Sequence, residues 1–272
     1  MLMLENLNCP AVMGILNVTP DSFSDGGDFF SPEKALDHAR QMIEEGAAII
    51  DVGGESTRPG AAIISVDEEL ARVIPVIEAI RAESDIPISI DTSKPEVMRA
   101  AVGVGASMIN DVRALQEVGA AEMAAELQVP VCLMHMQGGP QTMQFAPQYD
   151  DVVVQVADFL RQRIGHCITA GLPRDLIVLD PGFGFGKTLA HNQALLSGLD
   201  RLLEFELPLL VGVSRKSMIA HMLDLQVDER LYGSISLASI AVWQGASIIR
   251  AHDVAATLQA VQVSYMCKTA GN

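Results

Sequence analysis

Eight short apolar runs recur along the chain, and longer stretches with helical periodicity separate them. The runs cover residues 11–16, 48–52, 86–90, 107–109, 129–134, 176–179, 209–213 and 247–250. Within each run the apolar residues are continuous rather than alternating with polar ones, which is typical of parallel strands buried on both faces. One such stretch is expected to be a helix over residues 66–81, where Leu70, Val73 and Ile77 recur at the spacing of one helix face. Another is expected over residues 32–45, with Ser31 as its N-cap and Gly46 as its C-cap. The pattern therefore predicts alternating strands and helices.

Eight strand–helix units in 272 residues fit the size of a (β/α)8 TIM barrel, which typically takes about 250 residues. No linker or shift in composition divides the chain, so we expect a single domain over residues 1–272. Apolar residues make up 49% and charged residues 19%, which provides a sizeable core and argues against disorder. A doubly wound open sheet is the alternative architecture. In a barrel, the active site would lie at the C-terminal ends of the strands.

The net charge of −16 and an isoelectric point near 4.6 argue against nucleic acid or an anionic membrane as partner. No apolar run approaches the ~20 residues of a membrane span, and the N-terminal segment lacks the apolar core of a signal peptide. Cys9, Cys132, Cys167 and Cys267 lie far apart without a C-x-x-C pair, which is typical of a reduced chain without disulfides or zinc. We therefore expect a cytoplasmic protein whose partners are small molecules.

A polar residue closes or follows every one of the eight runs. These strand-end residues include Asn17, Asp51, Asp91, Asn110, His135, Asp180, Ser214 and Arg250. Taken singly, an Asp or Asn after a strand is most often a turn residue or a helix cap. Eight polar strand ends on one face of a barrel indicate a pocket instead, because that face carries the active site.

The strand-end residues combine acceptors for a flat heterocycle with donors for an anion. Asp180 only accepts hydrogen bonds, so it suits the N–H/NH2 edge of a pterin or guanine, and Asn110 can both donate and accept. Donors that suit a phosphate or diphosphate are Arg58, Arg250 and His252. Asn17 offers an oxygen to a magnesium ion that binds substrate phosphates. The set predicts group transfer from a diphosphate ester of a flat heterocycle.

The segment LDPGFGFGKT, residues 179–188, shares its last letters with a phosphate-binding P-loop. The P-loop pattern G-x-x-x-x-G-K-[ST] needs its first glycine at position 181, which is occupied by Pro181. Counting from Gly182 leaves the loop one residue short, and a nest of backbone N–H groups changes shape when a residue is lost. We therefore predict that the segment is not a P-loop, and Lys187 is assigned no role.

Eight segments around the strand ends carry a further signal. In chain order they are MGILNVTPDSFSDGG, DVGGESTRPGA, SIDTSKPEV, INDV, MHMQG, VLDPGFGFGK, VGVSRKSMI and IIRAHDV. Together they resemble the dihydropteroate synthase family of pterin-binding TIM barrels. The resemblance extends over residues 13–253, and its first two segments are long and highly specific. No departure falls at a position expected to do chemistry.

This resemblance implies a reaction and a set of site residues. The chain would join 7,8-dihydropterin-6-ylmethyl diphosphate to p-aminobenzoate, releasing diphosphate and forming 7,8-dihydropteroate for folate biosynthesis. It would use Mg2+ held in part by Asn17, and it would be a sulfonamide target. The implied pterin pocket is Asp91, Asn110, Asp180 and Lys216, and the implied diphosphate site is Asn17, Arg58, Arg250 and His252. The implied aminobenzoate site is Phe23, Thr57, Pro59, Phe185, Ser214 and Lys216.

The resemblance also implies which residues are catalytic. The C–O bond would break before the weakly basic aniline nitrogen attacks, and the sequence contains no apparent Ser-His-Asp or Cys-His nucleophile arrangement. Asp91 would stabilise the pterin cation, while magnesium, Arg250 and His252 would stabilise the departing diphosphate. Lys216 completes the implied catalytic set.

Three alternatives stay open at this point. A pterin-dependent methyltransferase on the same barrel would share the pterin residues but has no evident need of residues 214–216. A non-catalytic pterin-binding module would require damage in the first two loops, and both look intact. An aldolase could form a Schiff base on Lys216. Production of diphosphate separates the synthase from the methyltransferase.

The segment 234–243 is apolar on more than one helical face. An outer helix of a barrel needs only one buried stripe, so the surplus predicts a homodimer. The alternative is a helix that is tightly covered within the monomer.

Overall fold

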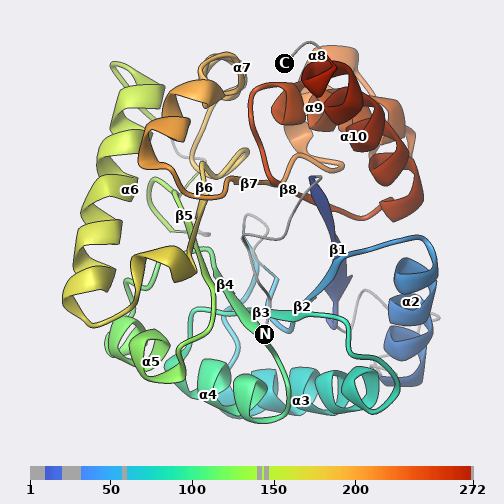
Figure 1. Cartoon of the computed structure of the whole chain (residues 1–272), viewed down its shortest axis with the longest axis vertical. Helices are drawn as coiled ribbons and strands as arrows, with labels where there is room; N and C mark the ends of the chain where they lie inside the picture. Colours follow the sequence, from blue (N-terminus) through green and yellow to red (C-terminus); the bar gives the residue numbers. More distant parts are fainter. Residues whose placement is uncertain (1–9, 20–31, 57–59, 140–142, 144–146, 271–272) are drawn as a thin grey trace.

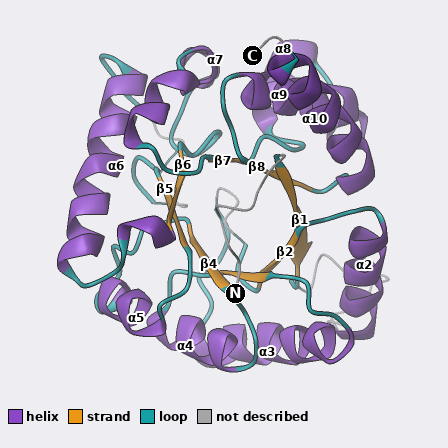
Figure 2. Ribbon diagram, in the orientation of Figure 1, coloured by secondary structure: helices purple, strands orange, loops and turns teal. Residues whose placement is uncertain are grey.

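The computed structural model describes residues 10–19, 32–56, 60–139, 143 and 147–270. Parallel strands form a ring around the centre of the molecule (Figures 1 and 2). The strands are β1 (Ala11–Asn17), β2 (Ile49–Gly53), β3 (Ile88–Asp91), β4 (Met108–Asp111), β5 (Val131–Met134), β6 (Ile177–Asp180), β7 (Leu210–Val211) and β8 (Ile248–Ala251). Their order in the sheet is β6-β5-β4-β3-β2-β1-β8-β7. Among the described residues, a single isolated bridge between Leu179 and Leu209 joins β6 to β7.

The helices form an outer layer around this ring (Figure 2). The α-helices are α2 (Pro32–Glu44), α3 (Val66–Glu83), α4 (Pro95–Gly103), α5 (Ala120–Leu127), α6 (Val152–Thr169), α7 (Leu189–Ser197), α8 (Ser217–Leu223), α9 (Leu231–Trp243) and α10 (Val254–Thr269). Short 3-10 helices are η2 (Arg174–Leu176), η3 (Leu199–Phe205) and η4 (Val227–Glu229). Eight parallel strands in a nearly closed ring with helices outside confirm the predicted (β/α)8 barrel and exclude the open sheet. Within the described residues no helix is long and apolar enough to cross a membrane.

Most of the observed strands begin and end one or two residues later than the apolar runs predict, but β1 begins with its run, β5 ends with its run, and β7 ends two residues before its run does. Two runs contain proline, and the strands start only after Pro87 and Pro130. Proline lacks the N–H that a ladder needs, although each of these prolines still accepts a bond through its carbonyl oxygen. At the other end, polar residues such as Asp91 and Asp180 are the last residues of their strands rather than the first of the loops.

The helix predictions need smaller corrections. The helix expected over 66–81 runs to Glu83, and Ser65 caps its start by accepting from the backbone N–H of Glu68. Gly46, expected to end the previous helix, has φ +94° and donates its N–H to the carbonyl oxygen of Ile43. The predicted N-cap Ser31 lies outside the described residues.

Strand residues pack in two apolar layers because successive side chains point to opposite faces of the sheet. Side chains such as Ile50 and Val52 point outward and belong to the large core shared with the helices. Inward-facing side chains form a second, smaller cluster inside the ring: Ala11, Met13, Ile49, Met108, Cys132, Val178, Leu210 and Ile248. The inside of the barrel is thus a packed apolar plug rather than a channel.

For six residues of this inner cluster, the residue two positions later in the chain faces the same interior. These later residues are Asp51, Asn110, Met134, Asp180, Gly212 and Arg250. Four of the six are polar or charged, and they lie above the plug on the side where the βα loops begin. The strand period therefore gathers the predicted polar residues into one layer.

Candidate active site

Arg250 on β8 is the centre of the polar layer. Its Nε donates to Asp51 Oδ2 at 2.6 Å, and its Nη2 donates to Asp91 Oδ2 at 2.9 Å. Asn110 Nδ2 donates to the same Asp51 oxygen at 3.1 Å. Four strands thus contribute to one bonded cluster, and the predicted residues Asp91, Asn110 and Arg250 lie together.

The charges in this cluster shift the pKa values of its members. Burial raises the pKa of Asp91 to about 8; the guanidinium of Arg250 opposes that shift, and the carboxylate of Asp51 adds to it. Burial also works against the charge of Arg250, but Asp51 and Asp91 outweigh it and raise the Arg250 pKa. Arg250 therefore keeps its positive charge, while Asp91 is the member whose protonation changes near neutral pH.

Asp180 and Lys216 form the opposite side of the layer. Asp180, at the end of β6, is buried, and its Oδ1 accepts from the backbone N–H of Gly182 at 2.7 Å. Burial raises the pKa of Asp180, and the ammonium of Lys216 opposes this. Lys216 Nζ donates to the carbonyl oxygen of Phe183 and lies 4.6 Å from the ring centroid of Phe185. Burial lowers the pKa of Lys216 to about 8, with Asp180 acting in the other direction.

Ser214 and His252 meet at the ends of β7 and β8. Ser214 Oγ lies 3.0 Å from His252 Nδ1 and accepts from the backbone N–H of His252 at 3.2 Å. The neighbouring Arg215 pairs with Asp253, with a distance of 3.0 Å between Nε and Oδ2. Ser214 is buried and His252 is half-buried, so the pair lies at the margin of the polar layer.

Asn17 ends β1 and is half-buried. Its register partner on β2 is Gly53, and a Cβ placed on Gly53 would meet the Asp91 side chain at 3.4 Å. Asn17, the predicted magnesium ligand, therefore lies beside Gly53, the last residue of β2, and Gly53 packs against the Asp91 side chain. Four predicted site residues, Phe23, Thr57, Arg58 and Pro59, lie outside the described residues.

Not every polar strand end belongs to the polar layer around Arg250. Asp111 is fully buried, and its carboxylate accepts from Ser93 Oγ and from the backbone N–H groups of Arg113 and Leu115, the latter two at 2.8 and 2.7 Å. It therefore holds the β4–α5 turn, as the turn interpretation of a strand-end Asp predicts. His135 is also buried and bonds Lys187, away from the Arg250 cluster.

Two groups escaped the sequence-based site prediction. One is Asp51, for which the sequence predicts a strand-end position but no role, although it accepts from both Asn110 and Arg250. Its two-residue offset from Ile49 in the apolar plug is the signal that could have identified it.

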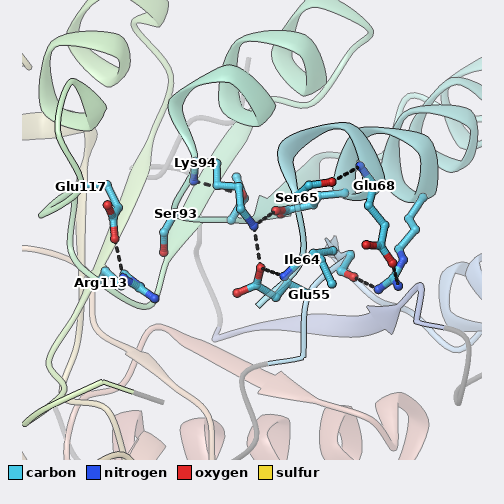
Figure 3. A network of polar contacts seen from close by, with 12 residues as sticks. Glu55, Ile64, Ser65, Glu68, Ser93, Lys94, Arg113 and Glu117 are labelled. Carbon is cyan, nitrogen blue, oxygen red and sulfur yellow. Dashed lines mark hydrogen bonds and ion pairs between the residues drawn. The ribbon is translucent and has the colours of Figure 1, made fainter. Parts of the chain in front are cut away.

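The other group is the ion pair network of Lys94. Lys94 Nζ lies 2.5 Å from Glu55 Oε2 and 2.5 Å from Glu69 Oε2, and Glu55 also accepts from the backbone N–H of Ile64 (Figure 3). Glu69 is fully buried on α3, and its Oε1 has no partner among the described residues. The network therefore joins Glu55 at the end of the β2 segment, Ile64 before α3, and Lys94 before α4.

Comparisons with known proteins agree with this geometry. A sequence profile of the family described as "Pterin binding enzyme" matches residues 13–252. Dihydropteroate synthase of Escherichia coli K12 is 58% identical over 95% of this chain and 92% of its own length. The Yersinia pestis dihydropteroate synthase, solved with a sulfonamide drug, superposes with TM-score 0.93 and 52% identity, covering 97% of this chain and 96% of its own. Xanthomonas albilineans dihydropteroate synthase with 4-aminobenzoic acid gives TM-score 0.91 and 50% identity over 97% and 94%.

A (β/α)8 barrel with paired carboxylates and cations at its strand ends, matched along nearly its whole length by the family profile, is a pterin-binding enzyme. Within that class the chain belongs to the dihydropteroate synthase family. It is thus an enzyme and a transferase, and the predictions of family, fold and activity are confirmed.

Proposed function

We propose that the polar layer at the strand ends carries out the transfer of a 7,8-dihydropterin-6-ylmethyl group from diphosphate to p-aminobenzoate. The observation that carries the proposal is the Arg250 guanidinium bound to Asp51 and Asp91, opposite the Asp180–Lys216 side of the same layer. One layer of side chains thus offers carboxylates to a heterocycle and cations to a leaving anion.

The pterin would be read by Asp180, Asn110 and Asp91. The Asp180 carboxylate can accept from the N–H and NH2 groups of the aminopyrimidinone. Asn110 gives one amide N–H to Asp51, which fixes the orientation of its side chain before the substrate arrives. Lys216, within reach of the same pocket, adds a donor for the heterocycle.

The diphosphate would be received by Arg250 and His252 together with Asn17 and Arg58. Arg250 has five N–H donors and uses two of them on Asp51 and Asp91, so others are left for an anion. Stabilising the departing charge in this way is worth more in a buried site than in water.

We include a magnesium ion in this proposal. Membership of the family is consistent with a divalent-cation requirement, and the described residues contain no group of three or more His, Cys, Asp or Glu that could hold a metal by themselves. Such a chain suits an ion that keeps most of its waters and takes its other ligands from substrate phosphates, with Asn17 as a protein ligand. When bound, magnesium would neutralise charge on the diphosphate.

The second substrate would lie between Phe185, Ser214 and Lys216, with Phe23, Thr57 and Pro59 completing the site. Support comes from the Xanthomonas albilineans relative solved with 4-aminobenzoic acid. As the methylene C–O bond breaks, its electrons leave on diphosphate, and Asp91 stabilises the pterin cation. The aniline nitrogen then forms the new N–C bond and releases one proton to the departing anion or to water.

The experiment is incubation with dihydropterin diphosphate, p-aminobenzoate and Mg2+, following dihydropteroate and diphosphate together. We expect the two products in equal amounts. A methyltransferase or a non-catalytic pterin-binding module would release no diphosphate, and borohydride trapping of Lys216 with a carbonyl substrate would indicate an aldolase.

We further propose a cytoplasmic homodimer with one domain over residues 1–272. The dimer is supported by an apolar surface on two packed helices: Ile240 and Trp243 on α9 and Val263 and Met266 on α10 are 46% to 68% exposed. The helices contact each other through Ser264 Oγ, which donates to the carbonyl oxygen of Ser239 at 2.8 Å. The cytoplasmic location is supported by the free thiols of Cys132, Cys167 and Cys267.

A further inference from the structure

The β6–α7 loop, residues 181–188, is held in shape by side chains rather than by regular structure. Gly182, Gly184 and Gly186 have φ of +70°, +79° and +59°, so the loop turns repeatedly through the left-handed region. Such a loop leaves its own N–H and C=O groups unpaired unless other groups bond them. The loop matters because it begins at Asp180 and carries Phe185.

Lys187 supplies two of these bonds from inside the loop, and side chains outside the loop, Asn192 among them, supply the others. It is only 4% exposed, and its Nζ donates to the carbonyl oxygens of Gly182 and Phe185 at 2.8 and 3.0 Å. Nζ also lies 2.9 Å from His135 Nδ1 and 3.4 Å from the His135 carbonyl oxygen. Burial, with Lys187 adding to it, lowers the pKa of His135 to about 3, so the imidazole is neutral and can accept.

Burial lowers the pKa of Lys187 well below its usual value, and the carboxylate of Asp180 opposes this shift. In either protonation state Nζ has hydrogens for both carbonyl oxygens, and it exchanges a third bond with His135 Nδ1, as donor when it is an ammonium and as acceptor when it is a neutral amine. No donor of Lys187 is left for a phosphate, which agrees with the prediction that this segment is not a P-loop. Among the described residues, Lys187 therefore bonds loop backbone and His135 rather than the polar layer around Arg250.

The loop also packs backbone to backbone against the end of β5. A Cβ on Gly182 would meet the His135 carbonyl oxygen at 1.9 Å, and one on Gly186 would meet the Gln137 carbonyl oxygen at 2.5 Å. Tyr149 donates its hydroxyl to the Gly186 carbonyl oxygen at 2.8 Å. The β5–α6 and β6–α7 loops thus touch through their backbones, with no space for a side chain between them, and Lys187 lies at this junction.

From this junction the structure leads directly to the second-substrate residues. The Phe185 carbonyl oxygen is held by Lys187 on one side, and the Phe185 ring lies under the Lys216 ammonium on the other. Asp180, in contrast, is also fixed by the strand, because its carbonyl oxygen accepts from the backbone N–H of His135 at 2.9 Å. Loss of the Lys187 Nζ group would therefore disturb Phe185 more than Asp180.

We propose that Lys187 is a positioning residue for the aminobenzoate site: the hydrogen bonds of its Nζ fix the β6–α7 loop so that the Phe185 ring stays against Lys216. The proposal rests on the proposed function, which assigns Phe185 and Lys216 to that substrate. Lys187 itself touches neither substrate in this account.

Lys187→Met removes the Nζ group with its hydrogen bonds and keeps an unbranched side chain that is one atom shorter. We expect the KM for p-aminobenzoate to rise about tenfold or more, with kcat and the KM for the pterin diphosphate within about threefold. A matched control is Arg174→Met, because Arg174 also donates to a backbone carbonyl oxygen, that of Phe205 at the end of η3, but at the opposite end of the barrel. The control should change stability and neither KM.

A double-mutant cycle with Phe185→Ala separates positioning from a general loss of stability. If Lys187 acts through Phe185, the double variant should have the aminobenzoate KM of Phe185→Ala alone, and additive effects would overturn the proposal. An unchanged aminobenzoate KM, or an equal rise in both KM values, in Lys187→Met would overturn it as well.

Should Lys187→Met not fold, Tyr149→Phe decides the matter, since it removes a single donor to the same loop. A selective rise of about threefold in the aminobenzoate KM supports the proposal, and no change overturns it. The proposed function is judged on the unmodified enzyme: absence of dihydropteroate there contradicts the function, whereas an active enzyme with insensitive variants contradicts only the role of Lys187.

Discussion

At the scale of single residues, Asp51 and Asp91 share one guanidinium. Arg250 bonds both carboxylates, yet Asp91 has its pKa raised to about 8 by burial, with Asp51 adding to the shift. Burial thus favours the protonated form of a carboxyl group that must be ionised to stabilise a cation. The deprotonation of Asp91 should therefore be visible in the pH dependence of the reaction rate.

We expect kcat/KM for the pterin diphosphate to rise with pH up to about 8, where Asp91 deprotonates in the free enzyme. The value of kcat/KM should rise with pH because only the ionised Asp91 carboxylate, which forms above its raised pKa, stabilises the positive charge of the pterin. Asp51→Asn removes one negative neighbour and should move this rising limb to lower pH. A pH profile measured on both proteins checks this, and an unmoved limb would contradict it.

Lys216 provides the control for that profile. Burial lowers its pKa to about 8, so its loss of charge gives a falling limb in the same region. Lys216→Arg keeps the charge at every accessible pH and should remove only the falling limb. The two variants therefore change opposite sides of one bell-shaped profile.

Asp180→Asn should weaken binding of the pterin diphosphate, because one of two acceptors becomes a donor that faces substrate N–H groups. The cost is about 2–3 kcal/mol for a charge-assisted pair in a buried site. Isothermal titration calorimetry on the variant measures it.

Asp111→Asn is the matched control for this substitution. Asp111 is a buried carboxylate at the end of a neighbouring strand, but it bonds Ser93 and the β4–α5 turn. The variant should lose stability and retain pterin affinity. Pterin binding by Asp180→Asn within twofold of the unmodified protein would contradict the assignment of Asp180.

At the scale of elements, the strands and their order of appearance could be predicted from apolar runs alone. Their limits could not, because a run records burial whereas a strand also requires a hydrogen-bonded N–H. Pro87 shows the difference, since it lies in the run but before the strand.

The candidate site could also be predicted in part: its main residues could be identified from the sequence, but not all of their contacts. Strand-end position selected Asp91, Asn110, Asp180 and Arg250, which the structure brings into one layer. Strand-end position alone could not distinguish Asp111 from these residues. Asn110 and Asp111 are the last two residues of β4, and successive side chains of a strand point to opposite faces of the sheet. The partners of Lys187 were also beyond the sequence, since they lie on two loops separated by some fifty residues.

The β6–α7 loop supports a prediction at this scale. Gly182 and Gly119 both have positive φ, +70° and +80°, but only Gly182 has a neighbour where a Cβ would lie. Gly119→Ala should cost about 1–2 kcal/mol from the backbone conformation alone. Gly182→Ala should cost more than about 3 kcal/mol, because the loops must also separate.

Urea unfolding of the two variants measures the difference. Equal losses would mean that the β6–α7 loop can move away from His135 without penalty. Such a result would also weaken the argument that Lys187 fixes this loop.

At the scale of the whole molecule, the α9–α10 surface determines the oligomeric state. Trp243, 54% exposed on this surface, is the single tryptophan of the chain. We expect a dimer by light scattering, and a blue shift of tryptophan emission as concentration rises, because association would bury the indole ring. Trp243→Glu should give a monomer.

Val118→Glu is the control for that substitution. Val118 is 95% exposed and lies just before α5, on another part of the chain. It should leave the dimer intact. Monomeric behaviour of the unmodified protein at micromolar concentration would contradict the proposed interface.

The barrel has a seam. Between β6 and β7 the described strands share one isolated bridge, at Leu179 and Leu209, whereas the other neighbouring strands are joined by ladders. Asp180 and Lys216 lie on opposite sides of this seam, so a pterin bound to both would act as a cross-link between its edges. Slow opening of the molecule should then begin here, and pterin should slow amide hydrogen exchange in residues 207–213 more than in residues 13–16.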